Sequence, residues 1–161
     1  MLGGSGSHNR LQYERGSPYG YDKWANITGD ASWRYENILK YFLRTENYRG
    51  RHSLSSGQHR TGGYVDVAAN PMTFREDIYF AAGKELGYET DIDPNGPQRV
   101  GFAAAEYNAR RGQRMSAYDG YLRPVRSRRN LVLRRYSVVS KVANDISMHG
   151  QMTVDSKVER C

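Results

Sequence analysis

The sequence has little of several features that would narrow its function. Cys161 is the only cysteine and also the last residue, so no disulfide can form within the chain and the redox compartment stays open. No apolar run reaches the roughly 18 residues of a membrane span, and the first residues do not form a secretory signal. Histidine and cysteine do not recur at the spacing of a zinc site. We therefore expect neither a disulfide-stapled scaffold nor a membrane-spanning helix nor a zinc finger.

The charged residues favour positive charge. The chain has 161 residues, with 24 Lys and Arg against 17 Asp and Glu, which gives a formal net charge of +7. Its length fits a single domain of roughly 100–200 residues. A basic surface attracts phosphates, nucleic acids and acidic partners alike, so the charge alone does not choose a function.

Two helices follow from periodicity and capping residues. The segment 33–44 is predicted to be a helix with one buried face. A shorter helix is predicted over 116–122, because the Ser116 hydroxyl can cap its start and Pro124 can stop it. The buried face of the first helix is predicted to comprise Tyr35, Ile38, Leu39 and Phe42.

A third helix is predicted over 72–86. Asn70 can cap its start, Pro71 suits its first turn, and Gly87 is typical of a helix end. Its apolar face is predicted to comprise Phe74, Ile78, Ala81 and Ala82.

The remaining segments predict strands and loops. Strands are expected over 64–67 and within 130–142, where Val, Leu and Tyr are frequent. A loop is expected over 46–61, which is rich in turn formers, and a tight turn over 94–97. The sequence therefore predicts a mixed α and β fold.

An ordered series of motifs resembles the glucose-methanol-choline oxidoreductases. Residues 1–9 (MLGGSGSHN) resemble the start of that family's first signature, and the signature continues with Tyr13, Arg15-Gly16 and Tyr21-Asp22. The resemblance extends over residues 1–142 because the later motifs keep the family's order. These later motifs lie at 33–42, 61–63, 82–88, 95–98, 101–102, 112–116, 121–124 and 130–131.

The resemblance implies a fold and a cofactor. Members of the family bind FAD on a doubly wound α/β domain and oxidise alcohols by passing a hydride to the flavin. This chain would be an α+β piece of such an enzyme that includes the first part of the substrate domain. The implied parts are a flavin-contacting loop at 1–25, a helix and connecting loop at 26–61, part of the substrate domain at 62–135, and a return toward the FAD domain at 136–161.

The family's glycine-serine loop lies against the flavin, and small residues let a backbone approach a cofactor closely. His8 is a candidate for covalent attachment, since some choline-oxidising members carry Ser-His-Asn there; a histidine that only hydrogen-bonds within the loop is the alternative. Val139 matches a position whose main chain meets the adenine, and an ordinary strand valine is the alternative. By resemblance, the FAD-binding residues are Gly3, Gly4, Ser5, Gly6, Ser7, His8, Asn9 and Val139.

The resemblance also implies what the chain lacks. The glycine turn that holds the FAD pyrophosphate would precede it, and the catalytic histidine would follow it. We therefore predict no catalytic residue here, an inactive isolated chain, and exposed apolar edges that favour aggregation. His52, His59 and His149 lie in polar segments and are predicted to be surface residues. The substrate is expected to be a small-molecule alcohol, with the electron acceptor and the oligomeric state open.

Two other interpretations stay open. A nucleic-acid-binding module would use the arginines near Tyr121 and Tyr136, which can hold phosphates beside stacked bases. A non-catalytic interaction fragment of the same family is the other. Localisation is open as well, since the sequon at Asn26 would be used only on a secretory route. The arginines of the first alternative are Arg123, Arg126, Arg128, Arg129, Arg134 and Arg135.

Overall fold

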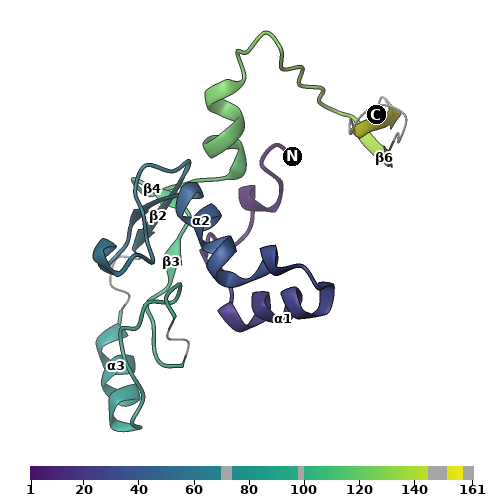
Figure 1. Cartoon of the computed structure of the whole chain (residues 1–161). Coiled ribbons are helices and arrows are strands. Elements are labelled where there is room, and N and C mark those ends of the chain that lie inside the picture. Colours follow the sequence, from purple (N-terminus) through teal and green to yellow (C-terminus); the bar gives the residue numbers. More distant parts are fainter. Residues whose placement is uncertain (70–73, 98–99, 145–151, 158–161) are drawn as a thin grey trace. The chain divides into compact units, whose positions relative to one another are not determined.

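The computed structural model describes residues 1–69, 74–97, 100–144 and 152–157, and it divides the chain into two compact units (Figure 1). The first unit is Met1–Pro124 and the second is Val125–Cys161. Helices and strands are mixed, as the sequence predicts. Within the described ranges, no helix is long and apolar enough to cross a membrane.

Two helices lie next to each other in the sequence of the first unit. Helix α1 (Pro18–Thr28) ends at Gly29, whose φ of 69° is left-handed, and helix α2 (Tyr35–Thr45) confirms the helix predicted over 33–44. No pattern in the sequence predicts α1, because its Pro and Gly are turn formers. Proline nevertheless suits the first turn of a helix, where its missing N–H would have no partner. The short 3-10 turn η2 (Ala31–Trp33) joins the pair.

A three-stranded sheet follows α2 directly. Strand β1 (Glu46–Arg49) runs parallel to β2 (Val65–Ala69), and β3 (Glu106–Tyr107) pairs antiparallel with β2. Strand β2 confirms the strand predicted over 64–67. The loop predicted over 46–61 is wrong for the four residues of β1, which pair with a strand that lies farther along the chain. Their polar sequence carries no strand pattern, so only the pairing with β2 shows it.

Helix α3 (Glu76–Glu85) confirms the helix predicted over 72–86 and its end before Gly87, but the helix begins later than predicted. Phe74 and Arg75 form a turn, and the proposed cap and first-turn proline at 70 and 71 lie outside the described residues. The predicted apolar face is wrong, since Phe74 is 86% exposed and Ile78 is 58% exposed. The buried members of α3 are Glu76 and Gly83, and the ring of Phe102 packs on this glycine.

The first unit ends in a hairpin and a short helix. Strands β4 (Ala109–Arg110) and β5 (Gln113–Arg114) pair antiparallel, and the π-helix η4 (Tyr118–Leu122) follows. Ser116 lies one residue before Ala117, the N-cap of η4, and makes reciprocal hydrogen bonds with Asp119: its Oγ accepts from Asp119 N at 3.4 Å, and its N–H donates to Asp119 Oδ2 at 3.1 Å. The helix ends at Leu122, although the chain turns on through Pro124 in the 3-10 turn η5 (Arg123–Val125).

The second unit contains one hairpin. Strand β6 (Val138–Asn144) pairs antiparallel with β7 (Met152–Lys157), with an irregularity between Val139 and Lys141. The strand predicted within 130–142 is therefore correct only from Val138 onward. Residues 131–135 have no regular structure, because no partner strand pairs with them in the described residues.

The core of the first unit is unusually polar. Buried apolar side chains are few, and Val67 is fully buried at the centre of the sheet. Buried charges need partners of opposite charge and hydrogen bonds to offset the loss of hydration. The buried polar and charged residues are Arg15, Glu46, His59, Asp66, Glu76, Asn95, Glu106 and Ser116.

Candidate functional site

The glycine-serine loop folds as a tight turn at the start of the chain. Its centre is the 3-10 turn η1 (Gly4–Ser7), and Gly3 and Gly4 have left-handed φ values of 90° and 59°. A Cβ on Gly3 would lie 2.5 Å from Ser7 Oγ and 3.0 Å from Ser116 Oγ, whereas a Cβ on Gly4 would meet nothing within 4 Å. Gly3 is therefore required by close packing, and the loop is open beside Gly4.

Arg114 holds the exit of this loop. Its guanidinium donates to Gly6 O at 3.1 Å, to Asn9 Oδ1 at 2.8 Å and to Asn9 O at 2.6 Å. Asn9 Oδ1 also accepts from Leu11 N at 2.9 Å. The structure thus brings the predicted loop residues together and adds Arg114 and Ser116 as their support. Both lie in the motif at 112–116, which was the signal for them in the sequence.

The polar side chains of the loop differ in their roles. Ser7 Oγ donates to Leu2 O at 2.7 Å, and the N–H groups of His8 and Asn9 donate to Ser5 O at 3.1 and 2.9 Å. The imidazole of His8 is exposed and makes no hydrogen bond to any described residue. Covalent attachment and hydrogen bonding of His8 therefore both stay predictions.

An extended segment, residues 11–15, leads from the loop into the core. Leu11 O accepts from Asn108 N at 2.7 Å, and Tyr13 N donates to Glu106 O at 2.8 Å. Leu11 has a left-handed φ of 68°, a conformation that costs a residue with a side chain about 1–2 kcal/mol. These contacts fix the path of the chain between the loop and Arg15.

Arg15 and Glu46 form a fully buried ion pair. Arg15 Nη2 lies 2.6 Å from Glu46 Oε2, and both side chains are 0% exposed. Arg15 also donates from Nη1 to Gln58 O at 2.7 Å and from its backbone N–H to Asn95 Oδ1 at 2.8 Å. The guanidinium contacts with Glu46 and Gln58 O offset its desolvation.

His59 joins this pair to Asp93. Its Nε2 lies 2.9 Å from Asp93 Oδ2, and its Nδ1 lies 3.4 Å from Glu46 Oε2 and from Arg15 Nη2. The ring stacks on Tyr48 with centroids 3.6 Å apart. The prediction of a surface histidine is wrong for His59, which is 4% exposed, because its partners come from distant segments. His52 is half-buried, and position 149 lies outside the described residues.

The charges of this cluster shift one another's pKa values. Burial alone would lower the pKa of His59, but the hydrogen bonds that its ring makes to the carboxylates of Asp93 and Glu46 raise it to about 9. Burial would raise the pKa values of Glu46 and Asp93. Hydrogen bonds from His59 and Arg15 hold the pKa of Glu46 below its ordinary range, and hydrogen bonds from His59 and the Asn95 backbone N–H do the same for Asp93. We name Arg15, Glu46, His59 and Asp93 the buried ionic cluster.

Glu106 lies beside the buried ionic cluster. Side-chain donor atoms of His59, Asp93 and Glu106 lie within 4.8 Å of one another, an arrangement that could hold a metal ion. His59 Nε2 already bonds to Asp93, and the two Glu106 oxygens accept from Tyr48 OH and Asn95 Nδ2. The protein's own hydrogen bonds therefore satisfy this arrangement.

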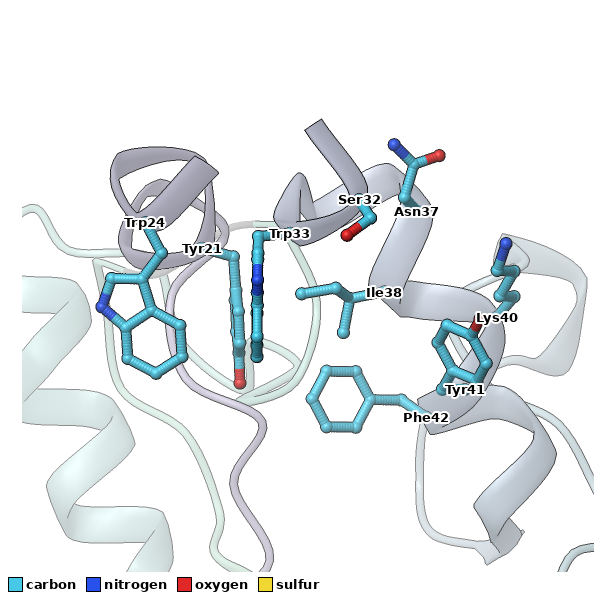
Figure 2. Close-up of a pocket in the computed structure, with 9 residues that line it drawn as sticks. All are labelled: Tyr21, Trp24, Ser32, Trp33, Asn37, Ile38, Lys40, Tyr41 and Phe42. Atoms are coloured by element: carbon cyan, nitrogen blue, oxygen red, sulfur yellow. The ribbon is translucent and has the colours of Figure 1, made fainter. Parts of the chain in front are cut away.

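An aromatic cavity lies between α1 and α2 (Figure 2). It has a volume of about 750 Å³, and Trp24 and Trp33 at its edge meet edge to face with centroids 5.6 Å apart. Trp24 is 53% exposed and Trp33 is 43% exposed. No residue of the glycine-serine loop, residues 3–9, lines this cavity. Its lining residues are Tyr21, Trp24, Ser32, Trp33, Asn37, Ile38, Lys40, Tyr41 and Phe42.

Val139 lies in the second unit. It sits on β6 with Ser156 opposite on β7. Its predicted contact with the adenine stays a prediction.

Comparison with known proteins identifies relatives. The family model described as GMC oxidoreductase matches residues 1–156. The chain is 36% identical over 151 residues to the oxygen-dependent choline dehydrogenase of Staphylococcus xylosus, an alignment that covers 88% of this chain and 25% of that protein. The chain thus spans about a quarter of the length of the curated relatives it matches. The family model also covers the arginine-rich segment 123–135. This match does not favour the nucleic-acid alternative.

Solved structures share the fold. Pyridoxine 4-oxidase from Mesorbium loti has a TM-score of 0.69 and 26% identity over 77% of this chain and 24% of that one. A fungal aryl-alcohol oxidase has a TM-score of 0.83 over 98% of this chain and 29% of its own, and at 17% identity it supports the fold alone.

Proposed function

This chain belongs to the GMC oxidoreductase family, and from that premise we propose that it is the flavin-contacting part of a FAD-dependent enzyme that oxidises the CH–OH group of an alcohol. The observation that carries the proposal is the geometry of residues 3–9. Two left-handed glycines, an open side beside Gly4 and an exit clamped by Arg114 form a backbone surface that a flat ring can approach.

The residues of the loop fit a flavin. Gly4 has no neighbour within 4 Å of a Cβ position, so the side of the loop at Gly4 is free of side chains. FAD, when bound, supplies the site that accepts the hydride from the alcohol carbon. The chain's own part is to hold the ring in place: Arg114 fixes Gly6 and Asn9, and the packing of Ser116 against Gly3 fixes the entry of the loop.

The substrate is proposed from the relatives. A relative at 36% identity is described as a choline dehydrogenase, which supports a small-molecule alcohol as the substrate of this enzyme too. No side chain of this chain is proposed as the catalytic base. We propose that residues outside this segment remove the hydroxyl proton.

Arg114 provides the test. In the flavin-loaded enzyme that contains this segment, Arg114→Leu should weaken FAD retention after desalting by at least about tenfold, because three hydrogen bonds of the loop are lost. Arg111→Leu, on the same hairpin, is the matched control and should retain the flavin absorbance. Equal flavin retention in Arg114→Leu and the parent enzyme would contradict the proposal.

A further inference from the structure

We propose that the buried ionic cluster is a proton-dependent anchor of the flavin-contacting loop, closed while His59 is a cation and opened when it loses its proton. The inference rests on the proposed function, since it assigns His59 and Arg15 as positioning residues for the flavin. It goes further by making flavin retention depend on the protonation of a residue outside the glycine-serine loop.

A continuous set of contacts joins the loop to the cluster. Arg114 clamps Asn9, and Asn9 Oδ1 accepts from Leu11 N. Leu11 O then accepts from Asn108 N, and Tyr13 N donates to Glu106 O. Arg15 ends this segment and inserts its guanidinium between Glu46 and Gln58 O. A shift of Arg15 therefore moves the extended segment that sets the exit of the loop.

Donation from the His59 ring to both carboxylates needs two N–H groups, whereas a neutral ring can instead accept at Nδ1 from Arg15 Nη2, which lies 3.4 Å away. Nε2 faces Asp93 at 2.9 Å and Nδ1 faces Glu46 at 3.4 Å. A neutral imidazole carries one N–H, so it can donate to only one carboxylate, whereas the cation donates to both. Loss of the proton releases one of these contacts and leaves a buried carboxylate with one donor fewer.

The carboxylates around His59 favour the cation, and the neighbouring Arg15 guanidinium opposes it. Arg15 comes from the extended segment, Glu46 and Tyr48 from β1, Asp93 from the loop before Asn95, and Glu106 from β3. His52 adds a weaker interaction with Asp93. With a neutral imidazole, the carboxylates of Glu46 and Asp93 would have one guanidinium beside them, that of Arg15 on Glu46. This imbalance raises the pKa of His59 to about 9, through its contacts with Asp93 and Glu46 against the opposing effect of burial.

The experiment measures flavin retention against pH in the flavin-loaded enzyme. Between about pH 6 and pH 10, the parent enzyme should hold FAD until His59 deprotonates, after which the apparent Kd should rise about tenfold per pH unit. His59→Gln should bind FAD weakly with no pH step, because glutamine carries no charge to lose. His59→Lys should move the step to higher pH, since lysine keeps its proton to about pH 10.4. Lys23→Gln removes an exposed cation on α1 and is the control, which should keep the parent profile.

The outcomes separate the two proposals. A pH-independent affinity in the parent enzyme, or an unchanged step in His59→Gln, would overturn the anchor and leave the proposed function standing. Absence of FAD binding at every pH would overturn the proposed function. NMR titration of the His59 ring measures its pKa without any flavin. A pKa near 6.5 would mean that the ring is neutral at mildly alkaline pH and that Nδ1 accepts from Arg15, and this result would overturn the anchor.

Discussion

The guanidinium of Arg15 and the carboxylate of Glu46 lie 2.6 Å apart, and neither side chain is exposed to solvent. Arg15 follows the glycine loop, and Glu46 is the first residue of β1. The pair therefore ties the loop's exit to the sheet. A buried pair adds little net stability compared with apolar residues of similar shape. Removing one partner, however, leaves the other charge buried without a counter-charge.

Arg15→Met is expected to lower the free energy of unfolding by about 3–5 kcal/mol, because Glu46 would stay buried without its guanidinium. Arg49→Met is the matched control. Arg49 also pairs with a carboxylate, but its side chain is 61% exposed, so we expect a cost of about 1 kcal/mol or less. Denaturant unfolding measures both, and similar costs for the two variants would contradict the role of the buried pair.

The stability of the fold should fall on the alkaline side. The pKa of His59 is about 9 in the folded chain and about 6.5 when unfolded. A raised pKa contributes stability that is fully present below pH 6.5 and is lost as the pH rises from there through about 9, on the order of 3 kcal/mol. Thermal unfolding against pH should show this decline, and His59→Gln should flatten it. A stability that stays level across this range would count against the cationic His59.

At acid pH, the stability of the fold should fall as the pH falls. The lowered pKa values of Glu46 and Asp93 contribute stability that is present above their unfolded pKa values and is lost as the pH falls through the folded ones. The same thermal unfolding series, extended to acid pH, should show this second decline.

Two adjacent glycines should differ in their tolerance of a methyl group. Gly3→Ala places a Cβ 2.5 Å from Ser7 Oγ at a left-handed φ, and we expect a cost of about 2–4 kcal/mol. Gly4→Ala meets only the backbone strain, about 1 kcal/mol, because no atom lies within 4 Å. Denaturant unfolding compares them, and a larger cost at Gly4 would refute this geometry of the loop.

Exposed apolar residues should make the isolated chain associate. Ile27 is 72% exposed on α1, and Phe74 is 86% exposed before α3. Ile27→Lys should lower the apparent mass in light scattering at high concentration. Asn26→Lys adds the same charge without removing apolar surface and should help less. A monomeric parent chain with a sharp thermal transition would disagree with this expectation.

Local patterns in the sequence predicted a large part of the fold. The stripe of α2, the strand β2 and the end of α3 at Gly87 all depend on residues within a few positions of one another. The motif order from the glycine loop onward likewise indicated the GMC family, which the match over residues 1–156 confirms. Such signals involve residues close together in the sequence, so they can be read without knowledge of distant contacts.

Only the tertiary structure decided the polar core. Nothing near His59 in the sequence shows that Glu46 and Asp93 will flank it, and nothing in the four residues of β1 shows that β2 will pair with them. The α3 face that looks apolar in sequence is exposed for the same reason, since burial depends on what packs against a helix. Sequence by itself determined the family, the glycine loop and several elements, among them α2, β2 and α3, whereas long-range pairing of charges decided which residues are buried and how the loop is held.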